Sequence, residues 1–173
     1  MSRVVSLAPA PLGAEARLFL RDEELDAALE LFVLADAALA SAADAALAGQ
    51  SSRLGRGHWR AAFLLKRRPG LGVQDLARLT GLSKQGASRV LRDLEAAGYV
   101  EKSAGQADAR RRPAQLTAEG AAFEERVSER LRHVLARAYR TGGLDAVGGA
   151  HRILTAVAGP RNAPRNPPPG TGS

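Results

Sequence analysis

The sequence predicts a mainly α-helical protein with a small antiparallel sheet of two or three strands. Aromatic residues make up only 4% of the chain, and alanine and leucine supply most of the apolar side chains, a composition that suits packed helices better than sheets. Long segments repeat apolar residues with the period of an α-helix. Two short strand-like segments, 99–103 and 113–117, enclose a loop that contains glycine.

The chain has 173 residues, a formal net charge of +7 and no cysteine. The missing cysteines exclude disulfides, thiolate metal sites and thiol redox sensing. The basic excess fits a polyanionic partner, nucleic acid before membrane, or else a solvated basic surface. The first residues lack the apolar core of a secretory signal, and Asp, Glu or Arg interrupts every long apolar stretch. We therefore expect a cytoplasmic protein without a membrane partner.

The first half of the chain reads as an irregular segment followed by three helices. Residues 1–20 contain prolines and have no helical pattern, whereas residues 21–50 read as one long helix with Asp22 as N-cap and a stop at Gly49. A second helix is expected over 57–68, closed by Pro69 and Gly70, and a third over 73–80.

The second half begins with a helix over 83–97, then the two short strands, then a long helix from residue 118 behind a Thr117 cap. A break at 141–143 precedes a last helix up to residue 158, and the Pro/Gly/Asn-rich residues 159–173 are expected to be disordered. A helix–turn–helix followed by a hairpin is the layout of a winged helix, which we assign to residues 51–117.

The helix over 83–97 has two opposite faces. Its apolar arc contains Ala87, Val90, Leu91, Leu94 and Ala97, and its polar side carries Gln85, Ser88, Arg89 and Arg92. Arginine and glutamine side chains can read guanine and adenine in the major groove of DNA. Ser83 and Lys84 at the helix start can meet a phosphate. The alternative is an ordinary surface helix with a solvated polar side.

The loop over 103–113 contains Asp108 and three consecutive arginines, Arg110, Arg111 and Arg112. An arginine at a hairpin tip can enter the minor groove beside a helix that reads the major groove. Asp108 could hold Arg110 in place by an ion pair. The alternative is that the arginines protect a sheet edge from aggregation.

The stretch LARLTGLSKQGASRVLRDLEAAGYVEKSAGQADARRRPAQLTAEG resembles the MarR family of winged-helix transcriptional regulators, most specifically over residues 56–120. The segments FLRDEELDAALELF and HRIL are similar to an alphaproteobacterial branch of that family. The resemblance implies a homodimer held by residues 21–50 and 118–158, and an operator with inverted repeats.

The family pattern also implies roles for single residues. It places Gln85, Ser88 and Arg89 near base edges and Ser83, Lys84 and Arg92 near phosphates, and it makes Arg110 the wing arginine, oriented by Asp108. Pro113 departs from the pattern, so we expect the second strand to start late.

Many family members release DNA when a small aromatic acid binds, so an effector of this kind is compatible with the resemblance but is not identified. The residues His58, Trp59, Arg60 and Phe63 would border such a pocket, although Trp59 and Phe63 read more simply as core and Arg60 as solvated. The ligand-binding residues therefore stay unknown. The three histidines have no companions at metal-ligand spacing, so no metal or cofactor is expected.

Other functions remain as alternatives. An enzyme is not predicted, because the Gly-rich fragments lack a phosphate-binding fingerprint and no catalytic constellation stands out. A sequence-tolerant architectural DNA-binding protein would also use the arginine run and the basic tail with Arg161 and Arg165. A winged helix used only for protein contacts is the third alternative.

Overall fold

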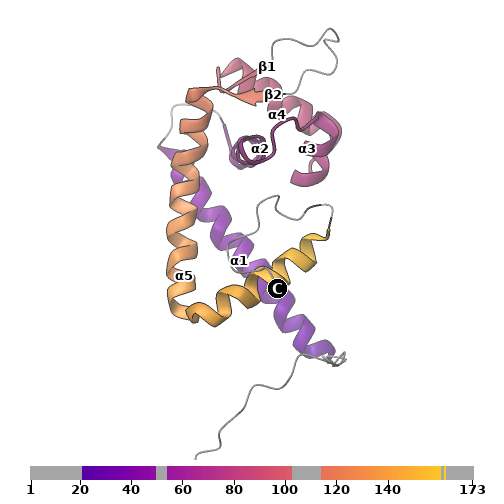
Figure 1. Ribbon diagram of the computed structural model, residues 1–173, viewed down its shortest axis with the longest axis vertical. Coiled ribbons are helices and arrows are strands. Elements are labelled where there is room, and N and C mark those ends of the chain that lie inside the picture. Colours follow the sequence, from indigo (N-terminus) through magenta and orange to yellow (C-terminus); the bar gives the residue numbers. More distant parts are fainter. Residues whose placement is uncertain (1–20, 50–53, 103–113, 161, 163–173) are drawn as a thin grey trace, which may run out of the picture. The chain divides into compact units, whose positions relative to one another are not determined.

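The computed structural model describes residues 21–49, 54–102, 114–160 and 162 (Figure 1). The chain divides after Ala35 into two compact units, residues 1–35 and residues 36–173. The elements in chain order are α1 (Asp22–Ala48), α2 (Arg56–Arg67), α3 (Val73–Thr80), α4 (Lys84–Ala96), β1 (Val100–Lys102), β2 (Ala114–Leu116) and α5 (Ala118–Ala158). The predicted fold class, mainly α-helical with a small antiparallel sheet, is confirmed, and the sheet has two strands in the described part of the chain.

The predicted start of α1 needs one correction. Asp22 is the first helical residue rather than the N-cap. The exposed N–H of Arg21 is instead satisfied by the Glu24 carboxylate, at 2.9 Å between nitrogen and Oε2. A carboxylate in the first helical turn is favourable because it faces the positive end of the helix dipole.

The two parts of α1 differ in burial. In the first unit every described side chain is exposed, including Leu31 and Val33, each 68% exposed. In the second unit Ala43 and Leu47 are buried in the core. By length and composition alone α1 is apolar enough to cross a membrane, with an 18-residue window of mean hydropathy 1.7. The acidic residues thus do not interrupt α1 as strongly as the sequence suggested, although the core helix of a soluble protein passes the same test.

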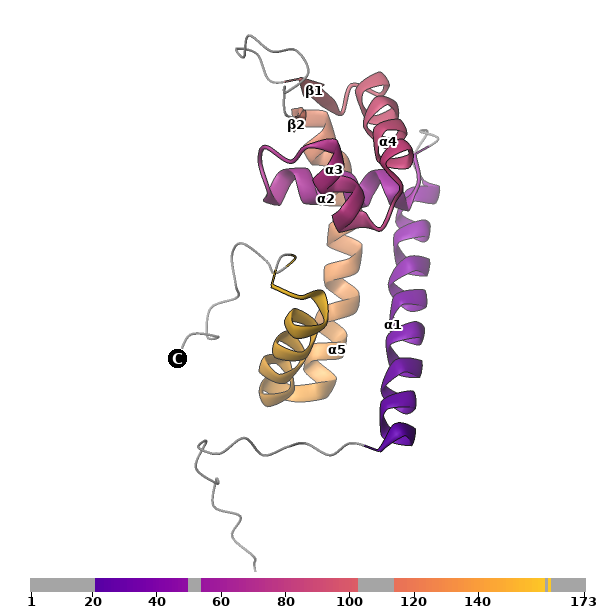
Figure 2. The same cartoon turned by 90° about the vertical axis from the view of Figure 1, so that its right-hand side faces the viewer.

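In the second unit, α2, α3, α4 and the hairpin gather around the N-terminal end of α5 (Figures 1 and 2). The core contains buried residues from all of these elements, and the largest fully buried side chains are Phe123, Leu76, Leu94, Glu124 and Val127. The hairpin is antiparallel, and Val100 pairs with Leu116. The second strand starts at Ala114, directly after Pro113, as predicted.

The predicted break at 141–143 lies inside α5. Gly143 has φ 78° and ψ 171°, a backbone conformation that glycine adopts readily and other residues avoid. The two parts of α5 consequently run in different directions (Figures 1 and 2). A side-chain contact between Tyr139 Oη and His151 Nε2, at 3.0 Å, spans the break.

The start of α5 lies against the backbone of the residue that precedes β1. The Thr117 hydroxyl donates to the Gly98 carbonyl at 2.7 Å and accepts from the Gly120 N–H at 3.1 Å. A Cβ on Gly120 would lie 2.0 Å from the Tyr99 carbonyl oxygen. The glycine is therefore required here by close approach of two backbones, and this approach lets the Tyr99 and Phe123 rings stack at 5.0 Å.

We predict that Gly120→Ala lowers the free energy of unfolding by about 1–3 kcal/mol, because α5 must move away from the hairpin. Gly149→Ala is the matched control in the same helix, since no atom lies within 4 Å of its added Cβ. Alanine is a better helix former than glycine, so the control should be neutral or slightly more stable. Urea denaturation measures both variants, and equal stability of G120A and the parent would contradict the close approach.

Candidate nucleic-acid interface

The segment from α3 to α4 forms a helix–turn–helix. Gly81 ends α3 in the left-handed region, at φ 73°, and Ser83 caps α4 by accepting from the Gly86 N–H at 3.0 Å. The predicted capping role of Ser83 is therefore confirmed. α4 buries Ala87, Val90 and Leu94 against the core, which fixes the direction in which its other side points.

The polar side of α4 points to solvent. Lys84, Gln85, Arg89 and Arg92 are exposed, as expected for a surface that meets DNA, whereas Ser88 is half-buried. Of the predicted apolar arc, Leu91 is half-buried, and Ala97 is exposed because it lies at the C-terminal cap of the helix. In Figure 2, α4 and the hairpin lie at one end of the second unit, beyond α3.

Sequence reasoning missed an acidic partner of Arg89. Asp93, one helical turn later, lies 3.9 Å from Arg89 Nε and 3.2 Å from His58 Nε2. The other ring nitrogen of His58 accepts from the Gly55 N–H at 3.0 Å, so in the neutral ring Nε2 carries the proton and donates to Asp93. The i, i+4 spacing of Arg89 and Asp93 was visible in the sequence, whereas the contact with His58 depends on how α2 and α4 pack.

The other predicted DNA-binding residues, Asp108, Arg110, Arg111 and Arg112, lie outside the described residues, so the structure does not test the wing contacts. The tail arginines Arg161 and Arg165 also lie outside them. No group of three or more His, Asp or Glu side chains within the described ranges could hold a metal ion.

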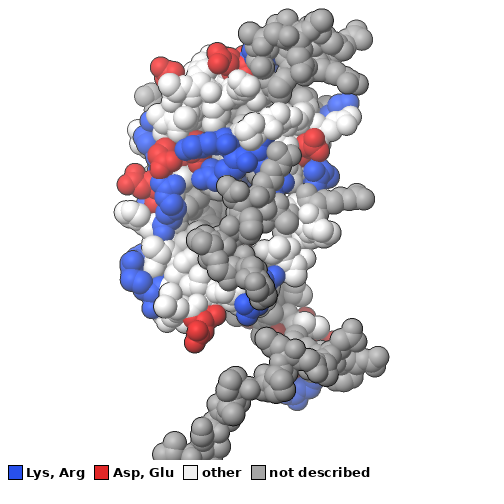
Figure 3. Space-filling view, in the orientation of Figure 1, with Lys and Arg blue, Asp and Glu red and all other residues white. Residues whose placement is uncertain are grey.

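A buried carboxylate joins α2 to α5. Glu124 has no solvent-exposed surface, and it accepts hydrogen bonds from Lys66 at 2.5 Å, Arg67 at 3.0 Å and Ser128 at 2.5 Å. Lys66 also binds Glu125. Lys and Arg side chains gather across the face that carries α2 in Figure 3, with acidic side chains beside them. Part of the basic surface of this unit is therefore neutralised by internal ion pairs.

The surroundings of Glu124 favour its charged form. Burial raises the pKa of this carboxyl, but the hydrogen bonds from Lys66, Ser128 and Arg67 outweigh burial, so its pKa lies below the usual 4.5. The hydrogen bonds to Glu124 and Glu125 raise the pKa of Lys66. Because the pKa of Glu124 is lowered by folding, its contribution to stability is present above about pH 4.5 and is lost as the pH falls through the lowered value.

We predict that Glu124→Gln lowers the free energy of unfolding by about 1–3 kcal/mol at neutral pH, because charged hydrogen bonds to a buried group are lost. The difference from the parent should narrow as the pH falls below about 4.5, where the parent carboxylate takes up a proton. Glu129→Gln, on the exposed side of the same helix, is the control. Denaturant titrations over a pH series measure both, and a difference that does not change with pH would contradict the assignment.

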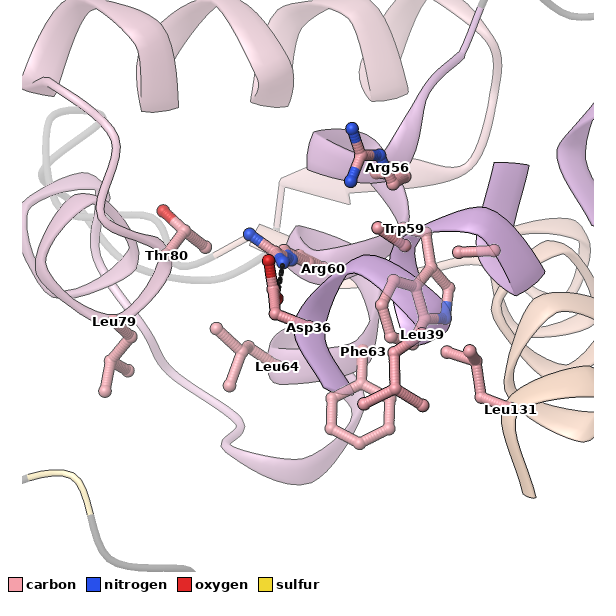
Figure 4. Close-up of a pocket in the computed structure, with 12 residues that line it drawn as sticks. Asp36, Leu39, Arg56, Trp59, Arg60, Phe63, Leu64, Leu79, Thr80 and Leu131 are labelled. Carbon is pink, nitrogen blue, oxygen red and sulfur yellow. Dashed lines mark hydrogen bonds and ion pairs between the residues drawn. The ribbon is translucent and has the colours of Figure 1, made fainter. Parts of the chain in front are cut away.

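A cavity of about 310 Å³ lies in the second unit between α1, α2, α3 and α5, within the size range of small-molecule sites. Apolar side chains line most of it (Figure 4), namely Leu39, Ala40, Ala43, Trp59, Phe63, Leu64, Leu79 and Leu131. Trp59 and Phe63 are half-buried lining residues, so the sequence interpretation of these two as simple core was incomplete.

Two arginines on one side of α2 supply the positive charge of the cavity (Figure 4). Arg60 pairs with Asp36 at 3.5 Å, and Arg56 pairs with Asp44 at 3.1 Å. Both acids belong to the part of α1 in the second unit. A carboxylate ligand that binds Arg60 would therefore compete with Asp36, and binding would alter a contact between α1 and α2. Arg60 was interpreted from the sequence as solvated, and it is exposed, but its contact with Asp36, which lies 24 residues away, was not predicted.

A helix–turn–helix whose second helix exposes a basic, amide-bearing side, followed by a two-stranded hairpin, defines a winged-helix protein of the DNA-binding class. Residues 54–111 match the MarR family. The HTH-type transcriptional regulator PetP of Rhodobacter capsulatus is 38% identical over 148 residues, which cover 86% of this chain and 88% of PetP. The chain therefore belongs to the MarR family, and it is a transcriptional regulator rather than an enzyme.

Structures of a second relative extend the comparison. The HTH-type transcriptional repressor Rv2887 of Mycobacterium tuberculosis is 39% identical over 74 residues, 43% of this chain and 53% of Rv2887. Its complex with salicylic acid has a TM-score of 0.58 and 30% identity, covering 73% of this chain and 93% of that one. Its complex with DNA has a TM-score of 0.56 and 29% identity, covering 75% and 96%.

Proposed function

We propose that the protein is a homodimeric regulator that reads an inverted-repeat operator, with residues 83–97 in the major groove and the wing, residues 103–113, in the minor groove. The observation that carries the proposal is the exposed side of α4, where Lys84, Gln85, Arg89 and Arg92 project away from a packed helix–turn–helix. The DNA complex of Rv2887 supports it, because that chain shares the fold at 29% identity.

The proposed contacts follow from side-chain chemistry. Gln85, Ser88 and Arg89 would approach base edges, and Ser83, Lys84 and Arg92 would bind phosphates. Asp93 restrains Arg89 from within the protein, so the guanidinium would reach the groove with fewer conformations to lose. In the wing, Arg110 would enter the minor groove beside Asp108, with Arg111 and Arg112 adding positive charge.

The proposed dimer would cover apolar surface that a single chain leaves open. Large side chains are exposed on the first part of α1 and on the last part of α5: Leu25, Leu29, Leu31, Phe32, Val33, Leu34, Leu144, Ile153, Leu154 and Val157. Apolar exposure of this extent marks an interface. We therefore assign residues 21–50 and 118–158 to dimerisation and 51–117 to DNA binding, in a cytoplasmic protein whose α1 meets a partner chain rather than a membrane.

We predict that Arg89→Ala weakens operator binding by about 1–3 kcal/mol and relaxes the preference at one base position. Arg110→Ala should weaken binding to all sequences and reduce the dependence on salt. Arg132→Ala, which removes an arginine paired with Glu125 on α5, is the control. The operator is first obtained by sequencing DNA fragments that co-purify with the protein, and fluorescence anisotropy then measures each variant.

The same titrations separate the alternatives. A regulator should prefer its operator over unrelated duplexes by orders of magnitude at physiological salt, whereas an architectural protein should bind all duplexes alike. A winged helix that serves only protein contacts would bind DNA equally well with and without Arg89 and Arg110. Either result would contradict the proposal that α4 and the wing read the operator sequence.

The cavity supports regulation by a small aromatic acid. Its apolar walls suit an aromatic ring, and Arg60 can pair with a carboxylate. The salicylic acid complex of Rv2887 shows that a related protein binds such a molecule. We propose that a ligand of this class enters the cavity, displaces Asp36 from Arg60 and changes how α2 and α3 hold α4.

We predict that salicylate raises the melting temperature of the parent protein. Arg60→Ala should need about ten times more salicylate for the same rise, because one charged hydrogen bond is worth about 1.5 kcal/mol or more. Arg132→Ala is again the control, since Arg132 does not line the cavity. Thermal shift against ligand concentration measures both. An unchanged response in Arg60→Ala would place any salicylate site elsewhere.

A further inference from the structure

A basic stripe runs along α5, formed by Arg130, His133, Arg137 and Arg140. Alternating steps of three and four residues keep these side chains on one side of the helix, over a length of about 15 Å. All four are exposed. With Val134 and Ala136 they line a hollow of about 460 Å³, and none of its described lining residues is acidic. In Figure 3, Lys and Arg side chains lie along the side on which α5 runs, with acidic side chains among them.

Within the described part of the chain, no acidic side chain pairs with the arginines of the stripe. Among the described residues, no Asp or Glu oxygen lies within 4.0 Å of the guanidinium groups of Arg130, Arg137 or Arg140. Other basic residues of the same unit are neutralised: Arg132 pairs with Glu125, and Lys66 pairs with Glu124. The stripe is therefore a concentrated positive surface that the described residues of the second unit do not neutralise.

The part of α1 in the first unit carries negative charge. Every charged residue of α1 is acidic, and Asp22, Asp26 and Glu30 follow one another at steps of four residues over about 12 Å. The described residues of this unit contain a single ion pair, between Arg21 and Glu24. The same segment exposes Leu29 and Val33. It thus offers a helix side that is both acidic and apolar.

We propose that the basic stripe of α5 binds the acidic side of α1 from a second copy of the chain. The two stripes have opposite charge and similar length. The half-buried Val134 and Ala136 lie beside the basic stripe, and the exposed Leu29 and Val33 lie beside the acidic one. This assignment rests on the proposed homodimer and gives it an ionic component. In a dimer with two-fold symmetry the contact occurs twice, so its contribution to the free energy of dimerisation is doubled.

Charge reversal tests the contact. The basic variant carries Arg137→Glu and Arg140→Glu, and the acidic variant carries Asp26→Lys and Glu30→Lys. Each alone should raise the dissociation constant of the dimer by roughly tenfold or more, because like charges then face each other. For the parent, raising salt from about 0.1 M to about 1 M, which shortens the Debye length from about 10 Å to about 3 Å, should also weaken the dimer.

Mixing the two variants shows whether the contact joins two chains. In a mixed dimer, the unaltered acids of one chain meet the unaltered arginines of the other, and the two reversed stripes also meet. We therefore expect the mixture to dimerise about as well as the parent, as measured by analytical ultracentrifugation. A chain that carries all four substitutions should also recover. Lys102→Glu, an exposed change on β1 and outside the segments assigned to dimerisation, is the control for added negative charge.

Three results would overturn the proposal. Recovery in the four-fold variant without recovery in the mixture would place the contact within one chain. An unchanged dimer in both reversed variants would remove the stripe from the interface, although the proposed homodimer would stand. Weaker operator binding with unchanged dimerisation would make the stripe a DNA contact.

Circular dichroism checks that each variant folds. If one reversed variant does not fold, the other reversed variant and the salt series test the proposal. A monomeric parent would instead refute the homodimer itself.

Discussion

The buried carboxylate of Glu124 is the interaction on which the arrangement of the second unit depends. It lies fully inside the protein, where a charge without partners would be strongly unfavourable. Lys66 and Arg67 approach it from α2, and Ser128 approaches it from one turn further along α5. The carboxylate is satisfied only when α2 crosses α5 at this level. The requirement thus sets the position of α2 relative to the long helix more strictly than apolar packing alone would.

Once α2 is fixed, its other side chains determine the rest of the site. His58, near its start, binds Asp93 of α4, and Trp59 donates its indole N–H to Ser128 at 3.1 Å. Arg60 binds Asp36 of α1. One helix therefore touches the helix proposed to read DNA, the cavity proposed to take an effector, and the helix proposed to form the dimer. A displacement of α2 would therefore change the surroundings of α4, of the cavity and of α1, because packed interiors deform little.

Much of this fold was predictable from sequence because it rests on local rules. The Gly81 turn, the Ser83 and Thr117 caps and the break at Gly143 each depend on a residue's own backbone preference or on a neighbour a few positions away. The apolar period of α4 likewise predicted which side is buried, and it failed only at Ala97, where the helix ends.

The features that sequence reasoning missed depend on contacts between distant segments. Sequence patterns did not single out Glu124, whose partners Lys66 and Arg67 lie 58 and 57 residues away. The need for glycine at position 120 comes from the Tyr99 carbonyl, 2.0 Å from an added Cβ, and the helical periodicity of α5 does not indicate this contact. The basic side of α4 was described without Asp93, which nevertheless lies within 4.0 Å of both Arg89 and His58. Pairings of this kind follow from the fold and not from periodicity.

Acidic and basic residues are segregated along this chain. This segregation affects whether the proposed dimer and the proposed DNA contact can form together. α1 carries only acids, whereas the exposed side of α4 carries Lys84, Arg89 and Arg92. An acidic α1 left uncovered would repel DNA phosphates. If the basic stripe of a partner binds α1, the acids of α1 are neutralised. Under this arrangement, added salt weakens both the ionic part of dimerisation and the phosphate contacts. The affinity for the operator should then fall more steeply with salt concentration than is expected from the phosphate contacts of a dimer that does not dissociate.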